Sequence, residues 1–162
     1  MTSTASTFAI RAALPSDFVA VSVLLLTNKL PIDGIPRSMD TFLVAEQDGI
    51  VIGTIGLVCY GPDVLLRSAV VNNVKRGMGL GSQLMQAIIA DAVRRGAETL
   101  WLLTTTVESW AQQFGFAVAD RSTVPASLLA SPAFQGTCST KATVMRRTVA
   151  PESSVPPALP SV

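Results

Sequence analysis

The amino-acid sequence predicts an α/β domain built around a mixed β-sheet. Its 162 residues suit one ordinary domain and leave no room for a second catalytic one. The N-terminal half carries β-rich runs joined by short turns, which is typical of an antiparallel meander. Residues 64–105 then alternate strand, glycine-rich loop, helix and strand, a pattern that predicts a right-handed βαβ unit with parallel strands. The expected sheet therefore contains both antiparallel and parallel pairs.

The first expected elements are a strand at 8–11 and a helix. Pro15 suits the start of that helix, because its missing N–H has no intrahelical partner there. Asp17 places a carboxylate in the first turn, where it complements the helix dipole. The helix is expected to end near Leu26, since 28–37 carries prolines and a glycine that predict a loop.

The meander follows this loop. Asp48-Gly49 predicts a tight hairpin, because both residues can adopt positive φ. Gly61-Pro62-Asp63 predicts a second turn. The expected strands of the meander are 41–46, 50–60 and 64–71.

A helix at 80–95 is predicted by apolar residues that recur every three or four positions, with Gly96 as its cap. The domain as a whole is expected to cover 8–148, between a frayed arm at 1–7 and a disordered, Pro-rich tail at 149–162. The remaining expected elements are a strand at 100–105, a short helix at 109–114, and strands at 116–120 and 142–147.

Composition excludes several functions. The net charge of +1 shows no basic footprint for nucleic acid. The most apolar run, 18–26, is far shorter than the ~20 residues that cross a bilayer. The absence of histidine removes Ser-His and Cys-His catalysis and most zinc sites, so no metal is expected. Two cysteines form no disulfide framework, and the N-terminus resembles no secretory signal, which together predict a cytoplasmic protein.

The glycine-rich segment between the predicted strand and helix, 74–82, predicts a phosphate or pyrophosphate site. Glycines let a backbone approach a ligand closely, and amides at a helix start point toward an anion. No Gly-Lys-Ser/Thr follows a four-residue gap, which excludes a Walker loop. A dinucleotide motif starting at Gly77 would need glycine where Ser82 stands. The spacing that remains is Arg76-x-x-Gly79-x-Gly81.

This spacing, preceded by Ala69-Val70-Val71, resembles the acetyl-CoA signature of the GNAT superfamily of N-acetyltransferases. The resemblance extends over 8–147 and includes Phe114-Gly115-Phe116, which is similar to the family's late Gly-Phe ending. It implies a splayed mixed sheet of about seven strands with helices on both faces. It also implies acetyl-CoA as co-substrate.

Three segments resemble the amino-acid acetyltransferase branch and the acetyltransferase domain of N-acetylglutamate synthases: 65–68 (LLRS), 102–106 (LLTTT) and 141–145 (KATVM). Residues 30–31 and 40–46 resemble the arsenic-resistance N-acetyltransferases more closely. The resemblance implies Arg67, Ser68, Thr104 and Lys141 as substrate-binding residues. The implied cofactor-binding residues are Ala69, Val70, Val71, Arg76, Gly77, Met78, Gly79, Leu80, Gly81 and Ser82.

The roles of individual side chains remain open at this point. Arg67 is either a guanidinium fork for the substrate carboxylate or a structural partner of an acidic residue. Many family members carry a tyrosine acid where this chain has Ala111, so that role passes to water, Thr104 or a neighbouring threonine. Asp33 and Glu108 are the candidates for the catalytic base.

These observations favour acetylation of the α-amino group of a small glutamate-like amino acid, arsinothricin or phosphinothricin among the candidates, as a detoxification. Three alternatives stay open: an N-acetylglutamate synthase-like enzyme, a protein or peptide N-acetyltransferase, and a non-catalytic acetyl-CoA-binding module. No nucleic-acid or membrane partner is expected. The apolar composition favours a homodimer.

Overall fold

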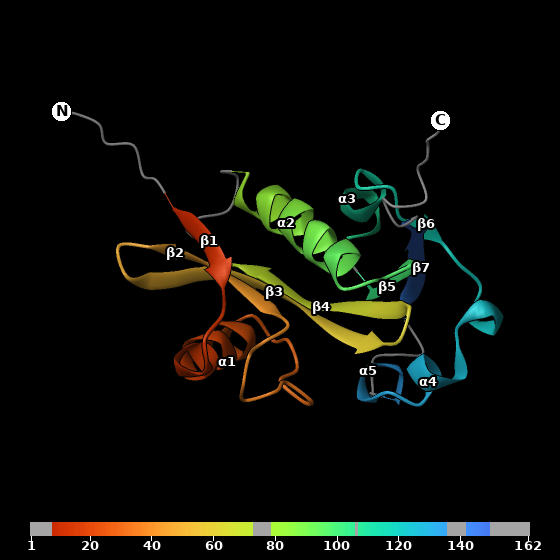
Figure 1. The fold of residues 1–162 in the computed structure, drawn as a ribbon, viewed down its shortest axis with the longest axis horizontal. Helices are drawn as coiled ribbons and strands as arrows, with labels where there is room; N and C mark the ends of the chain where they lie inside the picture. The colour runs from red at the N-terminus through yellow and green to blue at the C-terminus, as the bar shows by residue number, and fades with distance from the viewer. Residues whose placement is uncertain (1–7, 73–78, 106, 136–141, 150–162) are drawn as a thin grey trace, which may run out of the picture. The chain divides into compact units, whose positions relative to one another are not determined.

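The computed structural model describes residues 8–72, 79–105, 107–135 and 142–149 (Figure 1). Their strands form a seven-stranded sheet in the order β1-β2-β3-β4-β5-β7-β6. The strands are β1 (Ala9–Ala12), β2 (Phe42–Gln47), β3 (Ile50–Tyr60), β4 (Asp63–Val71), β5 (Thr99–Thr104), β6 (Ala117–Val118) and β7 (Thr143–Thr148). The sheet is mixed, as predicted, since β1, β2 and β3 pair antiparallel whereas β4 and β5 pair parallel.

Up to residue 115 the helices lie where the sequence predicted them. After residue 115 the structure contains helices that the sequence did not predict. Short helices between 121 and 135 were not predicted. The helical elements are the 3-10 turn η1 (Pro15–Asp17), α1 (Phe18–Thr27), α2 (Leu80–Arg94), α3 (Glu108–Gln112), the 3-10 turn η3 (Arg121–Thr123), α4 (Ala126–Leu129) and α5 (Pro132–Gln135). Among the described residues, no helix is long and apolar enough to cross a membrane.

The chain divides into two compact units. The first unit comprises residues 1–57 and 67–88, and the second comprises 58–66 and 89–162. The predicted arm, most of the glycine-rich loop (73–78) and most of the Pro-rich tail lie outside the described residues, as do Thr106 and Lys141.

The β2–β3 hairpin of the first unit forms as its turn sequence predicts. Asp48 and Gly49 have φ of 54° and 78°, which is the mirror-image turn that matches the twist of two paired strands. The register pairs Val44 with Thr54 and Ala45 with Gly53, and it shifts between Ala45 and Glu46. Adjacent residues of a strand point to opposite faces, so this hairpin offers two faces for packing.

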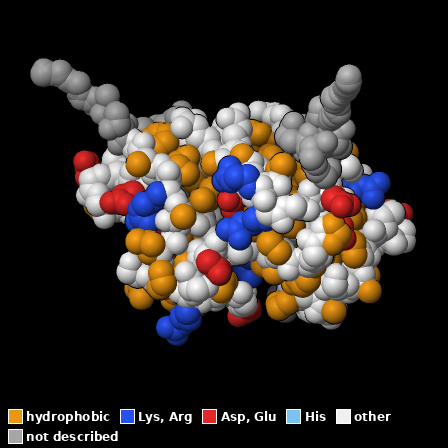
Figure 2. Space-filling view, in the orientation of Figure 1, with side chains coloured by type: hydrophobic (Ala, Val, Ile, Leu, Met, Phe, Trp, Pro, Cys, Tyr) orange, Lys and Arg blue, Asp and Glu red, His pale blue; other side chains and the backbone are white. Residues whose placement is uncertain are grey.

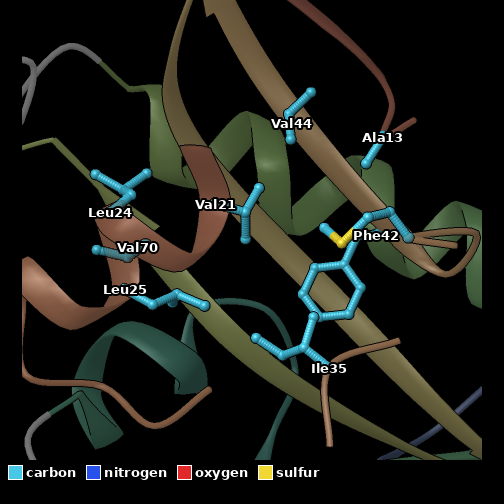
Figure 3. Packing of buried hydrophobic residues seen from close by; sticks show 9 residues of the cluster. Ala13, Val21, Leu24, Leu25, Ile35, Phe42, Val44 and Val70 are labelled. Carbon is cyan, nitrogen blue, oxygen red and sulfur yellow. The ribbon is translucent and has the colours of Figure 1, made fainter. Parts of the chain in front are cut away.

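Helix α1 covers one face of this hairpin. Its buried residues Val21, Leu24 and Leu25 belong to one hydrophobic cluster with Phe42 and Val44 (Figure 3). The start of α2 covers the opposite face, on which Gly53 lies. A Cβ added to Gly53 would stand 3.1 Å from Leu84 and 3.5 Å from Leu80. Helices therefore pack on both faces within this unit, as the family resemblance implied (Figure 1).

An ion-pair cluster joins β1, η1 and β2. Arg11 donates from Nη1 and Nη2 to both carboxylate oxygens of Asp17, at 2.8 and 3.0 Å, and from Nε to Glu46 at 2.7 Å. Asp17 also accepts the backbone N–H of Leu14 at 2.7 Å. The hydrogen bonds from Arg11 lower the pKa of Asp17 more than its burial raises it. The sequence assigned Asp17 to the helix dipole, whereas the structure makes it the acceptor of a bidentate arginine.

This cluster predicts a pH dependence. Asp17→Asn is expected to reduce the free energy of unfolding at neutral pH by about 1.5–3 kcal/mol, because a charged acceptor is lost. The folded-state pKa of Asp17 lies below its unfolded value, so its contribution is complete above the unfolded value and disappears as the pH falls through the folded one. Urea unfolding of both proteins from neutral to acid pH should show their difference shrinking at the acid end. A constant difference would contradict the assignment.

The second unit packs around β5 and β7, which pair along the whole length of both strands. Its core contains Leu65 and Trp101, and the Trp101 indole donates to Asp63 at 3.0 Å. The unpredicted helices belong to this core through Leu128 and Phe134. The late strand predicted at 116–120 is confined to Ala117–Val118, the only residues of that stretch in the β6–β7 ladder.

Candidate functional site

The parallel ladder between β4 and β5 is short. It joins Asp63, Val64 and Leu65 to Thr99, Leu100 and Trp101. In the described part of the chain no further rung joins these strands, although β4 runs on to Val71 and β5 to Thr104. Most candidate residues lie on β4 beyond Leu65, at the end of β5, or in the segments that follow these two strands.

Strand β4 is irregular at the predicted substrate-binding residue Ser68. Its φ is 60°, in the left-handed region that costs about 1–2 kcal/mol for residues with a Cβ. The next residue, Ala69, is exposed, and Val70 is buried in the core of the first unit. Backbone strain of this kind gathers at sites where a strand must turn its groups toward a ligand.

Arg67 lies just before this irregularity and reaches the loop between α1 and β2. Its Nε donates to the Ser68 hydroxyl at 2.9 Å, and its Nη1 and Nη2 donate to the carbonyls of Asp33 at 2.6 Å and Pro31 at 3.4 Å. The acceptors of these three hydrogen bonds are one hydroxyl and two backbone carbonyls. The structure thus brings three candidates together in the first unit: Arg67, Ser68 and Asp33, whose side chain is exposed.

The start of α2 has the geometry that the glycine pattern predicts. Gly79 has φ of 78°, and no atom of the described residues lies within 4 Å of a Cβ built on it. Leu80 is buried and anchors the helix start, whereas Gly81 and Ser82 are half-buried. A helix leaves its first N–H groups without intrahelical acceptors, and α2 has no acidic residue in its first turn. These features suit an anion such as pyrophosphate. The predicted contacts Arg76, Gly77 and Met78 lie outside the described residues.

A second group of candidates lies in the second unit, where β5 ends and β7 begins. Thr104 and Thr143 face each other in the β5–β7 ladder. The Thr104 hydroxyl accepts the backbone N–H of Val107 at 2.9 Å, which places Glu108 at the start of α3. The Thr143 hydroxyl donates to Glu108 Oε2. The sequence indicated Thr104 and Glu108, but it missed Thr143, because that contact depends on strand register.

The tyrosine that many family members carry has no counterpart here. Ala111 of α3 occupies that position and is fully buried. Tyr60, the chain's one tyrosine, is half-buried and packs against the core of the second unit.

No metal centre marks the described residues. In residues 8–72, 79–105, 107–135 and 142–149, no three His, Cys, Asp or Glu side chains lie together as ligands. Figure 2 shows Lys and Arg side chains in separate places among acidic and apolar ones. Arg37 lies over the Phe18 ring at 4.5 Å.

Solved acetyltransferases share this fold. N-acetylglutamate synthase from Neisseria gonorrhoeae, complexed with coenzyme A and N-acetyl-glutamate, matches with a TM-score of 0.77 and 19% identity, over 90% of this chain and 36% of that chain. Rv2747 from Mycobacterium tuberculosis, in complex with CoA and NLQ, matches with a TM-score of 0.73 and 19% identity, over 88% and 99% of the two chains. These two proteins share the fold of this chain.

The sequence itself assigns the family. Residues 38–118, half of the 162-residue chain, match the acetyltransferase (GNAT) domain, and the chain belongs to this family. An amino-acid acetyltransferase of Pasteurella multocida is 27% identical over 125 residues, which are 72% of this chain and 28% of that protein. The amino-acid acetyltransferase of Shewanella oneidensis is 34% identical over 89 residues, which are 54% and 20% of the two proteins. The chain thus spans less than a third of these relatives.

Proposed function

We propose that this chain is an acetyl-CoA-dependent N-acetyltransferase that acetylates the α-amino group of a small, glutamate-like amino acid. The relatives named amino-acid acetyltransferase support the acceptor class. The neighbour complexed with coenzyme A and N-acetyl-glutamate supports both the donor and the acceptor. The observation that carries the proposal is the start of α2, where an open glycine at positive φ precedes a helix turn without acidic residues.

In the proposed reaction the substrate nitrogen attacks the thioester carbonyl carbon of acetyl-CoA. The C–N bond forms and the C–S bond breaks. The ammonium nitrogen loses two protons on the way to the amide, of which the departing CoA thiolate takes one and solvent takes the other. Amides in the first turn of α2 hold the pyrophosphate. Amides of residues 69–71 polarise the thioester carbonyl as an oxyanion hole does. Holding both reactants in place supplies ~7–11 kcal/mol in effective concentration.

The acceptor is further proposed to carry a second anionic group on its side chain, as arsinothricin and phosphinothricin do. The resemblance of 30–31 and 40–46 to arsenic-resistance acetyltransferases supports this choice. Acetylation removes the ammonium charge and with it recognition by enzymes that bind glutamate, which would make the reaction a detoxification.

A substrate panel tests this proposal. Release of CoA from acetyl-CoA should be followed with arsinothricin, phosphinothricin, glutamate, aspartate and a basic peptide side by side. Turnover of at least one of the amino acids and none of the peptide is expected. Turnover of the peptide alone would replace the amino-acid proposal by a peptide acetyltransferase. CoA binding without any turnover would leave a non-catalytic binding module.

The Arg67 guanidinium is proposed to bind the substrate's α-carboxylate. Arg67→Ala is expected to cost about 2–5 kcal/mol in kcat/KM for the amino acid, because a charge partner is lost, while the KM for acetyl-CoA stays unchanged. Arg67→Lys keeps the charge but not the planar fork, so it should recover only part of the activity. A folded Arg67→Ala protein with normal kcat/KM would show that Arg67 serves only to hold the Pro31 and Asp33 carbonyls.

A further inference from the structure

We propose that the solvent-facing side of α1 is an interface at which two copies of this chain pair, with their α1 helices antiparallel across a two-fold axis close to Val23. The observations behind this pairing are an exposed apolar stripe on an uncharged helix and opposite net charges at the two ends of that helix. Every residue involved belongs to the first unit, and the pairing does not depend on the proposed function.

Helix α1 is apolar on two sides. Its buried residues pack with those of β2 in one cluster, yet Val19, Val23 and Leu26 are 70%, 56% and 57% exposed. These three residues follow one another at steps of four and three, which is the spacing at which side chains of one helix meet those of a second. Ala20 and Thr27, which are also exposed, flank them. A contiguous apolar stripe of this kind, unlike apolar residues that are scattered singly, indicates an interaction surface.

The absence of charge on α1 favours a second copy of the same chain as the partner. At a two-fold interface a residue near the axis meets its own copy, so a charged residue there would face a like charge. Helix α1, Phe18–Thr27, contains no Asp, Glu, Lys or Arg. An axis near Val23 also brings Val19 of one copy to Leu26 of the other, so apolar side chains meet along the whole stripe. A lipid surface is a poorer partner, because helices that lie on membranes carry Lys and Arg on their polar face.

Opposite charges at the two ends of α1 favour the antiparallel arrangement. At the N-terminal end, Arg11 is shared between Asp17 and Glu46, and one positive and two negative charges leave this cluster with a net charge of −1. Just after the C-terminal end lies Lys29, which is exposed and takes part in none of the ion pairs among the described residues. Antiparallel pairing brings Lys29 of each copy toward the negative cluster of the other, whereas parallel pairing would bring like charges together. Antiparallel helix dipoles add to this preference.

A groove beside α1 extends the apolar stripe. It is lined by Val23 and Thr27 of α1 and by Ile50 and Val51 at the start of β3. Ile50 is 63% exposed, so an aliphatic side chain from a second copy would cover it together with the stripe. A pair of ten-residue helices with this addition is a small interface. The dimer is therefore expected to be reversible rather than permanent.

Sedimentation velocity of the full chain, from about 1 to 100 μM, tests the pairing. The wild-type mass should rise from 17.0 kDa toward twice that value as the concentration increases. Val23→Glu puts two carboxylates at the axis and should stay monomeric throughout. Its melting temperature at the lowest concentration should match that of the wild type, because Val23 is 56% exposed. Val118→Glu, at a 58% exposed residue of β6 in the second unit, is the matched control and should dimerise like the wild type.

Lys29→Glu tests the arrangement of the charges. Each new carboxylate would face the negative cluster of the other copy, so the dissociation constant of the dimer should increase several-fold. Added salt should reduce this increase, because interactions between exposed charges are screened. A dissociation constant equal to that of the wild type at low salt would overturn the antiparallel arrangement.

The mass of the wild-type chain is decisive in the other direction. A value of 17.0 kDa at every concentration would overturn the proposal, and the stripe would then belong to another protein or to a segment of the chain itself. A Val23→Glu protein that dimerises as well as the wild type would also overturn it, because the dimer would use another surface. If Val23→Glu fails to fold, Leu26→Glu on the same side of α1 replaces it with the same expectation. Turnover of amino acids tests the proposed function separately and does not affect these results.

Discussion

Gly79→Asp is expected to abolish the thermal stabilisation that CoA gives the wild-type protein. Among the described residues, no atom lies within 4 Å of a Cβ built on Gly79, so the new side chain is expected to obstruct chiefly a ligand that approaches the backbone. The carboxylate also repels pyrophosphate. A ligand at 100 times its Kd stabilises a folded protein by about 2.7 kcal/mol, and this contribution should disappear.

The positive φ of Gly79 calls for a matched variant. Asn and Asp both enter the left-handed region several-fold more readily than other residues, so Gly79→Asn imposes similar backbone strain without the charge. Gly79→Asn should keep part of the thermal stabilisation by CoA. The difference in this stabilisation between the Asn and Asp variants measures the effect of the carboxylate charge. Gly96→Asp, at the other end of α2 and also at positive φ, should lower the melting temperature but retain the full CoA shift. Normal stabilisation of Gly79→Asp by CoA would refute the loop assignment.

The strands and α2 could be predicted because their patterns are strong. Alternation, the Asp48-Gly49 turn and the apolar spacing of 80–95 each select one local structure, and the structure has β3 at Ile50–Tyr60, as the sequence predicted. The helices between 121 and 135 carry no such period. They are four residues or fewer, and they owe their place to Leu128 and Phe134, which fill the core of the second unit. Tertiary packing of this kind cannot be predicted from the local sequence.

The candidate site was predictable in its residue types and not in its contacts. Gly79 could be expected at positive φ, because only glycine adopts it at no cost. Ser68 could not, since nothing in a serine within an apolar strand signals a left-handed residue. Arg67 donates to two loop carbonyls that the sequence did not indicate, because their position depends on how the chain turns after α1. A side chain's partner follows from the fold, which residue type alone does not give.

Phe42→Ala is expected to reduce the free energy of unfolding by about 3–5 kcal/mol, which is a large share of the ~5–15 kcal/mol of an ordinary domain. Phe42 is 1% exposed and lies at the centre of the cluster between α1 and the β2–β3 hairpin (Figure 3). Urea unfolding should show the loss. Ile50→Ala, on the same hairpin but with a side chain that is 63% exposed, is the control and should change stability by at most about 0.5 kcal/mol.

Gly56, the cross-strand partner of Phe42, allows a second test of this packing. Phe42 pairs with Gly56 across the β2–β3 ladder, and its ring covers the glycine so closely that an added Cβ would stand 2.5 Å from a ring carbon. Gly56→Ala alone should therefore cost about 1–3 kcal/mol through overpacking. In the Phe42→Ala background the ring is absent and the same change should cost much less, so the double-mutant cycle should show a coupling of about 0.5–3 kcal/mol. If the stability losses of the two single variants are additive, Gly56 is required for its backbone conformation. The Phe42 ring would then not depend on the space that the glycine leaves.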